Sequence, residues 1–113
     1  MKPIIDWSDF EKLDLRIGTI LEARSFSEAR KPAYQLKVDL GKEIGIRQSS
    51  AQITDRYTPE MLIGKQVIAV VNLPPLKIAG FRSEVLVTGI YNELNEVVLV
   101  GPDTHVPNGQ PLC

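Results

Sequence analysis

Residues 67–87 read VIAVVNLPPLKIAGFRSEVLV, two apolar runs that enclose a polar loop. Because both runs are rich in Val, Ile and Leu, they predict two buried strands. Pro74 and Pro75 end the first strand, since proline donates no backbone hydrogen bond and fixes its own backbone angle. Gly80 permits a sharp bend further along the loop. The pattern therefore predicts a strand, a rigid turn, a polar loop and a second strand.

The loop between these strands carries chemically useful side chains. Lys77 and Arg82 are cations, Phe81 is an aromatic residue expected to be exposed, and Ser83 and Glu84 are polar. Loops held between stiff elements are where binding sites are usually built. The alternative is a hairpin connection whose polar residues only keep it in water.

Composition limits the functions that are open to the chain. Its 113 residues are enough for one domain, and a hydrophobic fraction of 43% is ordinary for a globular protein. The net charge of −1 counts against a strong generic nucleic-acid binder. However, all 13 lysines and arginines lie at or before Arg82, and residues 83–113 carry four acids. This asymmetry permits a local basic patch, although it also arises by chance in small proteins.

The termini and the single cysteine predict a cytoplasmic protein without membrane insertion. No run approaches the roughly 20 apolar residues of a membrane span. Residues 1–7 are too short and too acidic for a signal peptide. Cys113 cannot form an internal disulfide, which fits a reducing compartment.

Periodicity predicts an all-β chain with short helices. We expect a helix at 7–13 with Ser8 as N-cap, a helical turn at 51–54, and a helix that begins at Thr58-Pro59 and ends at Gly64. Strands are expected at 15–25, 33–40, 43–48, 66–71, 83–91 and 97–100. A helix between the third and fourth strands fits a five-stranded Greek-key OB-fold barrel. The expected organisation is one domain, 1–113, with a helical extension at about 1–13.

The residues that catalysis or metal binding would need are scarce. One histidine and one cysteine do not make a zinc site, and no acidic cluster has the spacing of a calcium loop. His105 has no serine or cysteine motif to serve as a general base. We therefore expect a protein that is not an enzyme and that holds no cofactor.

Two groups of residues remain as candidate binding sites. The first joins cations, which neutralise phosphates, to an aromatic face, which stacks on a base: Lys77, Phe81 and Arg82, together with Arg30, Lys31 and Arg47. A solvated basic surface is the alternative. The second group offers hydroxyls and an amide to a nucleotide edge or to a peptide backbone: Ser49, Ser50 and Gln52. Helix capping by Ser49 or Ser50 is the alternative there.

The loop also resembles the hallmark of a known family. Six residues occupy its pattern: Asn72, Leu73, Pro75, Lys77, Gly80 and Ser83. The chain thus resembles the tRNA-binding OB-fold domain found at the C-terminus of many bacterial methionyl-tRNA synthetases. The likeness covers the chain from about Phe10 onward and implies an OB barrel.

Residues 43–54 are most similar to a free-standing, chaperone-like branch of that family. This resemblance implies a homodimer that binds unfolded or precursor polypeptides in the cytoplasm and is linked to protein export. The chain departs from the tRNA-binding pattern at residues 26–32, where only Ala29 and Lys31 match. It also carries Gln48-Ser49-Ser50 where the family usually has Val-Ser-Gly.

Our preferred hypothesis is a dimeric, peptide-binding protein with an apolar groove floor and a polar rim. Apolar contacts are expected from Leu76, Ile78 and Phe81, and polar contacts from Lys77, Arg82, Ser49 and Gln52. The alternative is a tRNA-binding protein acting in trans through Lys77, Arg82, Asn72, Ser83, Arg30 and Lys31. A docking domain that only assembles with larger partners is a third possibility.

Dimerisation has its own basis in the sequence. Residues 4–7 are apolar for a terminus, with two isoleucines and a tryptophan. A small barrel leaves little apolar area to cover them. They are expected to pack either on a partner or on their own barrel.

Overall fold

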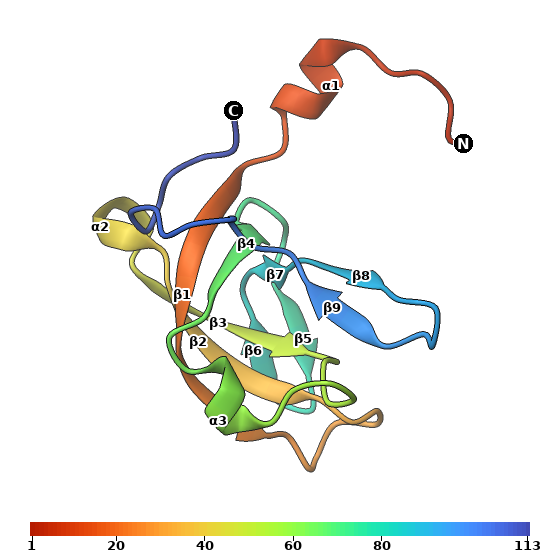
Figure 1. The fold of residues 1–113 in the computed structure, drawn as a ribbon, viewed down its shortest axis with the longest axis vertical. Coiled ribbons are helices and arrows are strands. Elements are labelled where there is room, and N and C mark those ends of the chain that lie inside the picture. The colour runs from red at the N-terminus through yellow and green to blue at the C-terminus, as the bar shows by residue number, and fades with distance from the viewer.

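A five-stranded antiparallel sheet curls into a nearly closed barrel in the computed structural model, which describes residues 1–113 (Figure 1). The strands lie in the order β3-β2-β1-β4-β7. Their bounds are β1 Leu15–Ser25, β2 Tyr34–Asp39, β3 Ile46–Ala51, β4 Gln66–Val70 and β7 Leu86–Val87. The long strand β1 pairs with β4 through its first half and with β2 through its second half. The expected all-β, OB-fold-like barrel is confirmed.

The barrel closes between β3 and residues 83–85, largely through side chains. The Gln48 backbone N–H donates to the Glu84 carboxylate at 3.0 Å, and the Glu84 N–H donates to the Gln48 carbonyl at 2.9 Å. The Ser49 hydroxyl, which is 1% exposed, donates to the Val85 carbonyl at 2.8 Å. Buried backbone groups that a regular ladder would pair are satisfied by these bonds.

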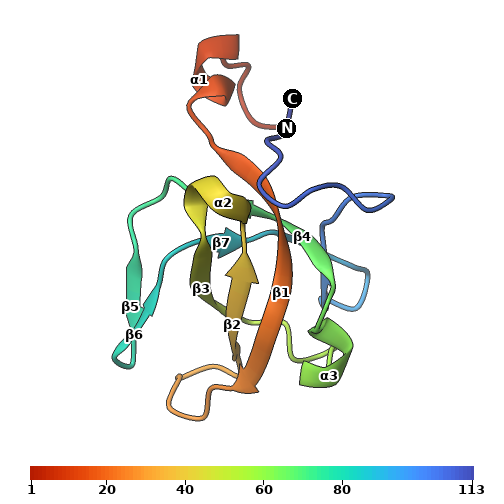
Figure 2. The ribbon, with the colours of Figure 1, turned by 90° about the vertical axis from the view of Figure 1, so that its left-hand side faces the viewer.

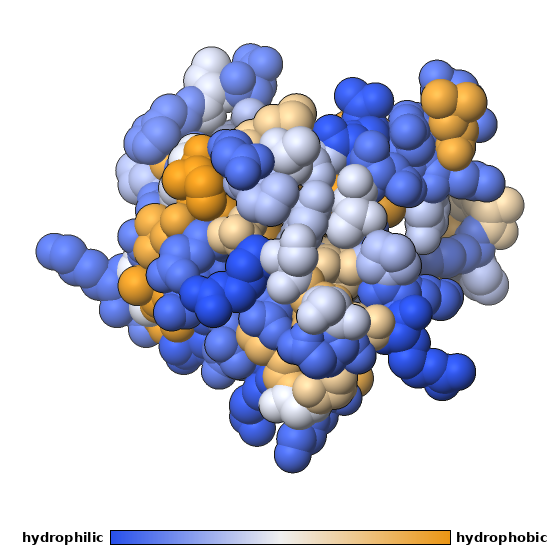
Figure 3. All heavy atoms as spheres, turned by 90° about the horizontal axis from the view of Figure 1, so that it is seen from below, coloured by the Kyte–Doolittle hydropathy of each residue, from blue (hydrophilic) through white to orange (hydrophobic).

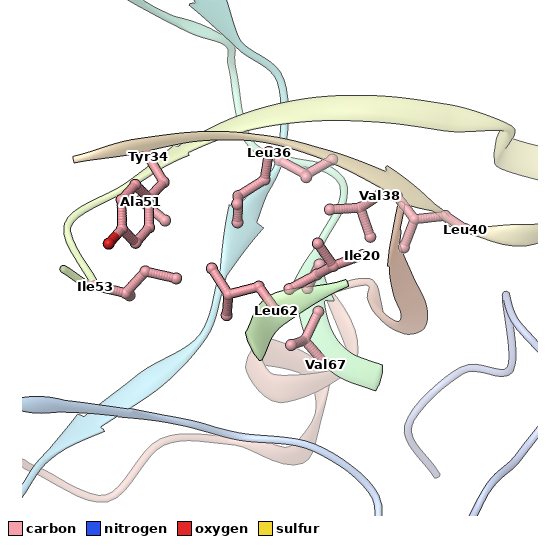
Figure 4. Close-up of a cluster of buried hydrophobic side chains, with 11 residues drawn as sticks. Ile20, Tyr34, Leu36, Val38, Leu40, Ala51, Ile53, Leu62 and Val67 are labelled. Carbon is pink, nitrogen blue, oxygen red and sulfur yellow. The ribbon is translucent and has the colours of Figure 1, made fainter. Parts of the chain in front are cut away.

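The core fills the barrel with aliphatic side chains (Figure 4). Strand β2 shows the reason, because its alternate residues Tyr34, Leu36 and Val38 are buried while Lys37 is exposed. The short helix α3 (Pro59–Leu62) lies between β3 and β4, where a helix was expected. Its only buried residue is Leu62, which is fully buried in the core cluster.

Two hairpins extend from the barrel. The first joins β5 (Leu76–Ile78) to β6 (Phe81–Ser83), and the second joins β8 (Gly89–Tyr91) to β9 (Val97–Leu99). Ala79 and Gly80 form the first turn with φ values of 47° and 82°. Positive φ at both central residues defines a type I′ turn, whose twist matches that of the flanking strands. The polar loop of residues 72–83 is thus largely a hairpin.

The helix α1 (Trp7–Glu11) stands away from the barrel at the top of Figure 1, and none of its residues is buried. The expected N-cap Ser8 is wrong, because the cap is Asp6. The Asp9 carboxylate accepts from the Asp6 backbone N–H at 3.3 Å, which fixes the start of the helix two residues earlier than Ser8 would. The longest helix has only five residues, so no helix of the structure could cross a membrane.

Three other expectations about local structure are also wrong. Residues 41–44 form a short helix, α2 (Gly41–Ile44), and β3 begins after Gly45 rather than at residue 43. The Asp39 carboxylate accepts from the Gly41 N–H at 3.0 Å and turns the chain there. Residues 49–51 belong to β3, so no helical turn begins at residue 51. The expected strand at 83–91 is divided among β6, β7 and β8. Glu84 binds Gln48 between β6 and β7, and the Thr88 hydroxyl donates to the Ile68 carbonyl between β7 and β8.

The C-terminal segment is bound along β1, beside the part that β2 leaves unpaired. The Gly109 backbone N–H donates to the Ile17 carbonyl at 2.7 Å, and the Ile17 N–H donates to the Gln110 carbonyl at 3.0 Å. The Arg16 guanidinium, 16% exposed, binds Asp14 at 2.6 Å and Glu43 at 2.9 Å. The hydrogen bonds that Arg16 donates to both carboxylates raise its pKa above the ordinary value, and they tie β1 to α2.

Candidate binding site

A cleft opens between the loop of residues 26–33 and the β5–β6 hairpin, which lie at the same side of the barrel (Figure 2). We call it the loop–hairpin cleft. Its volume is about 850 Å³, within the range of ligand sites. It is lined by Glu28, Ala29, Arg30, Lys31, Ala33, Ser50, Gln52, Lys77, Ile78 and Ala79. Residues that are far apart in the sequence therefore meet in one cavity.

The rim of the cleft is positively charged. Arg30, Lys31 and Lys77 are exposed, and none of them takes part in an ion pair. The single acid on the rim is Glu28, whose carboxylate accepts from the Ser27 hydroxyl at 2.6 Å. Three cations without partners leave the cleft able to attract carboxylates or phosphates.

The floor of the cleft is apolar. Ala33 is 5% exposed, and Ala29 and Ile78 are half-buried. The barrel end that carries this loop is mostly hydrophilic in Figure 3, with apolar residues showing between the charged ones. A small apolar floor within a polar rim suits an extended chain whose side chains alternate in character.

Phe81 is half-buried and holds the hairpin against the loop. Its ring meets the ring of Phe26 edge to face, with centroids 5.4 Å apart. Such an aromatic pair contributes about 0.5–1.5 kcal/mol beyond the area it buries. Phe81 also lines a separate hollow of about 230 Å³ with Gln48 and Lys37. It therefore lies beside the loop–hairpin cleft and forms part of its support.

The two serines of the second predicted group have structural partners. Ser49 closes the barrel as described, and the Ser50 backbone N–H donates to the Ser83 hydroxyl at 3.0 Å. Only Ser50 and Gln52 of this group reach the cleft. Arg82 is exposed, and its carbonyl accepts from the Gln48 amide at 2.9 Å.

Three further predicted residues lie outside the cleft. Arg47 is exposed in a shallow hollow beside Lys37 and Glu84. Leu76 is 66% exposed at the base of the β5–β6 hairpin. Asn72 bridges to the N-terminal extension, since its amide donates to the Lys12 carbonyl at 2.7 Å and accepts from the Asp14 N–H at 2.9 Å.

We predict that Asn72→Ala lowers the free energy of unfolding by about 1 kcal/mol, because two hydrogen bonds are lost at an exposed site. Residues 1–12 should become more sensitive to limited proteolysis, while affinity for tRNA and for unfolded protein stays unchanged. Urea titration and binding titrations measure both effects. Weaker tRNA binding at unchanged stability would instead make Asn72 an RNA contact.

Sequence reasoning missed four residues that line the cleft: Glu28, Ala29, Ala33 and Ala79. Alanines carry no chemical signal, so their role depends on the neighbours that the fold gives them. Ala79 had one usable signal, its place before Gly80 in a two-residue turn.

The fold agrees with what comparison of the chain with known proteins finds. A family model described as "Putative tRNA binding domain" matches residues 15–111, so the chain belongs to that family. The methionine–tRNA ligase of Flavobacterium johnsoniae is 40% identical over 108 residues, which are 96% of this chain and 15% of that enzyme. The chain therefore spans about 15% of the length of such curated relatives.

Among solved structures, the chain is similar to the chaperone CsaA from Bacillus anthracis str. Ames. The two share 53% sequence identity and a TM-score of 0.92, over 98% of this chain and all of the other. CsaA from Picrophilus torridus is 48% identical with a TM-score of 0.91, over 97% of this chain and all of that one.

Proposed function

We propose that this chain is a non-catalytic, chaperone-like protein that binds unfolded or precursor polypeptides in the cytoplasm, in connection with protein export. The observation that carries the proposal is the loop–hairpin cleft, in which three unpaired cations surround an apolar floor. Such a site can hold an extended segment without reading one fixed sequence. Similarity to two chaperones over nearly the whole chain supports this choice.

A second candidate function is tRNA binding in trans. It is favoured by the family match over residues 15–111 and by the same three cations, which would neutralise phosphates. Two observations weigh against it. Phe81, the expected stacking residue, packs on Phe26, and the net charge of the chain is −1.

Binding of an unfolded precursor protein and of bulk tRNA, each titrated across a salt series, tests the proposal. We expect micromolar or tighter binding of the unfolded protein that persists at high salt, because the apolar floor is not screened. A tRNA complex held by three phosphate contacts would instead lose affinity with a log–log slope of roughly −2 to −3. Steep, tight tRNA binding without polypeptide binding would contradict the proposal.

We also propose that the protein is a homodimer. Ile4, Ile5 and Trp7 are 89%, 63% and 83% exposed, which is unusual for large apolar residues. An apolar groove of about 450 Å³ lies along the C-terminal segment, lined in part by Leu15, Ile17, Ile68, Pro102, Val106 and Leu112. The N-terminal segment and the C-terminus lie at the same end of the molecule (Figures 1 and 2). An exchange of N-terminal segments between two copies would cover both surfaces.

The double variant Ile4→Ser/Trp7→Ser is expected to be monomeric. Light scattering after size exclusion, at about 10 µM, should give the chain mass of 12.6 kDa for this variant and twice that mass for the parent protein. Leu94→Ser is the matched control, because Leu94 is 71% exposed on the β8–β9 hairpin. A parent protein that elutes as a monomer would exclude the dimer at this concentration.

A further inference from the structure

The outer edge of β5 has no strand partner. β5 pairs only with β6, and the pair Ile78–Phe81 closes the two-residue turn. In such a hairpin the closing pair exchanges both backbone hydrogen bonds, and the next pair exchanges none. That next pair is Lys77–Arg82, so the N–H and C=O of Lys77 point away from β6. No hydrogen bond from outside the hairpin reaches either group.

This edge forms a wall of the loop–hairpin cleft, since Lys77, Ile78 and Ala79 line it. A backbone N–H and C=O that face a cavity can pair with a second extended chain. Resting on the proposed function, we propose that the client polypeptide enters the cleft in an extended form and adds to β5 as a further strand.

The β5–β6 hairpin already holds its free edge in the geometry that strand addition requires. Phe81 packs on Phe26, and the Ser83 hydroxyl accepts from the Ser50 N–H, so both anchors belong to β6 and leave β5 uncovered. The type I′ turn at Ala79-Gly80 holds the two strands in register. Because the edge is already formed, binding does not have to order it.

Charge selects the occupant of this edge. Arg30, Lys31 and Lys77 are exposed and unpaired around the cleft. A second copy of the chain would bring the same basic edge, and like charges opposite each other disfavour strand pairing. An extended segment with acidic residues would be attracted instead. The occupant is therefore an acidic stretch of an unfolded chain, which the cations attract and which pairs with β5 through its backbone.

Backbone N-methylation tests strand addition without changing the protein. The probe is a capped nine-residue peptide of alternating valine and glutamate, made in three forms: unmethylated, N-methylated on the valines, or N-methylated on the glutamates. In a strand, alternate N–H groups face opposite edges. We expect one methylated form to lose at least tenfold in affinity and the other to stay within about twofold of the unmethylated peptide.

Equal affinities of the two methylated peptides, whether retained or lost, would overturn strand addition. So would an unmethylated peptide that fails to bind. Unfolded precursor protein is titrated in parallel, and its failure to bind would overturn the proposed function itself. The two failures are thus distinguishable.

Variants of Lys77 give a second, protein-side test. Lys77→Ala removes the cation and keeps the outward N–H, whereas Lys77→Pro removes both and is compatible with an edge strand. We expect the proline variant to bind the unmethylated peptide at least tenfold more weakly than the alanine variant. Circular dichroism checks that both fold. Equal affinity of two folded variants would contradict a backbone contact at residue 77.

Discussion

Leu62→Ala is expected to lower the free energy of unfolding by about 3 kcal/mol, the middle of the range for removing a buried leucine side chain. Leu62 is fully buried in the core cluster, near Ile53 and Val67 in Figure 4. The alanine leaves a cavity that the surrounding strands cannot fill, because a closed barrel collapses only slightly. The melting temperature should fall by roughly 10 °C or more.

The neighbouring residue provides the control for this prediction. Met61 lies in the same helix turn and is 58% exposed, so Met61→Ala should change the free energy of unfolding by less than about 0.5 kcal/mol. Urea denaturation followed by circular dichroism measures both variants. Equal destabilisation by the two substitutions would show that α3 does not seal the core through Leu62.

Leu62 also explains why so short a helix exists. A helix of four residues is far below the length that is stable alone in water. The sequence shows the start of α3 through Thr58 and Pro59, but its persistence comes from burying one leucine. The pattern therefore predicted the helix correctly, although propensity alone would not maintain it.

The strands of the barrel were predictable because their alternation is local. In β2 the inward residues follow period two, and the core confirms it. In β1 a register shift between Ile20 and Glu22 breaks the alternation, so that Ile20 is buried and Leu21 is exposed. The closure of the barrel was not predictable, because it joins Gln48 and Ser49 to residues 36 positions away through side-chain bonds. A serine at the end of a predicted strand indicates a helix cap or a turn. Only the fold shows that Ser49 instead donates to the Val85 carbonyl.

Close approaches between distant segments also could not be predicted from the sequence. A Cβ on Gly101 would lie 2.5 Å from the carbonyl oxygen of Gln66, so glycine is needed there for space. No turn or periodic pattern around residue 101 indicates that neighbour. The same limit applies to the candidate site, where Arg30 and Lys77 share a cleft only because the loop and the hairpin meet. The cations and the aromatic residue could be predicted as candidates from the sequence. Which of them line the same cleft depends on the fold.

The charge of the cleft leads to the largest expected effect on binding. The triple variant Arg30→Glu/Lys31→Glu/Lys77→Glu should bind an acidic unfolded polypeptide roughly a hundredfold more weakly at low salt. Each substitution removes an attraction and adds a repulsion, and the three side chains surround one cavity. Since the rim is exposed, the loss should shrink as salt rises.

A control of equal charge separates this local effect from a change in net charge. Lys2, Lys42 and Lys65 are exposed and lie outside the cleft, so the triple Lys2→Glu/Lys42→Glu/Lys65→Glu changes the total charge by the same amount. When both triples are compared at physiological salt, we expect this control to bind within about threefold of the parent protein, because the Debye length there is about 8 Å. Comparable losses in the two triples would mean that the whole surface, rather than the loop–hairpin cleft, attracts the client. Full retention of affinity in the cleft triple would place the polypeptide elsewhere.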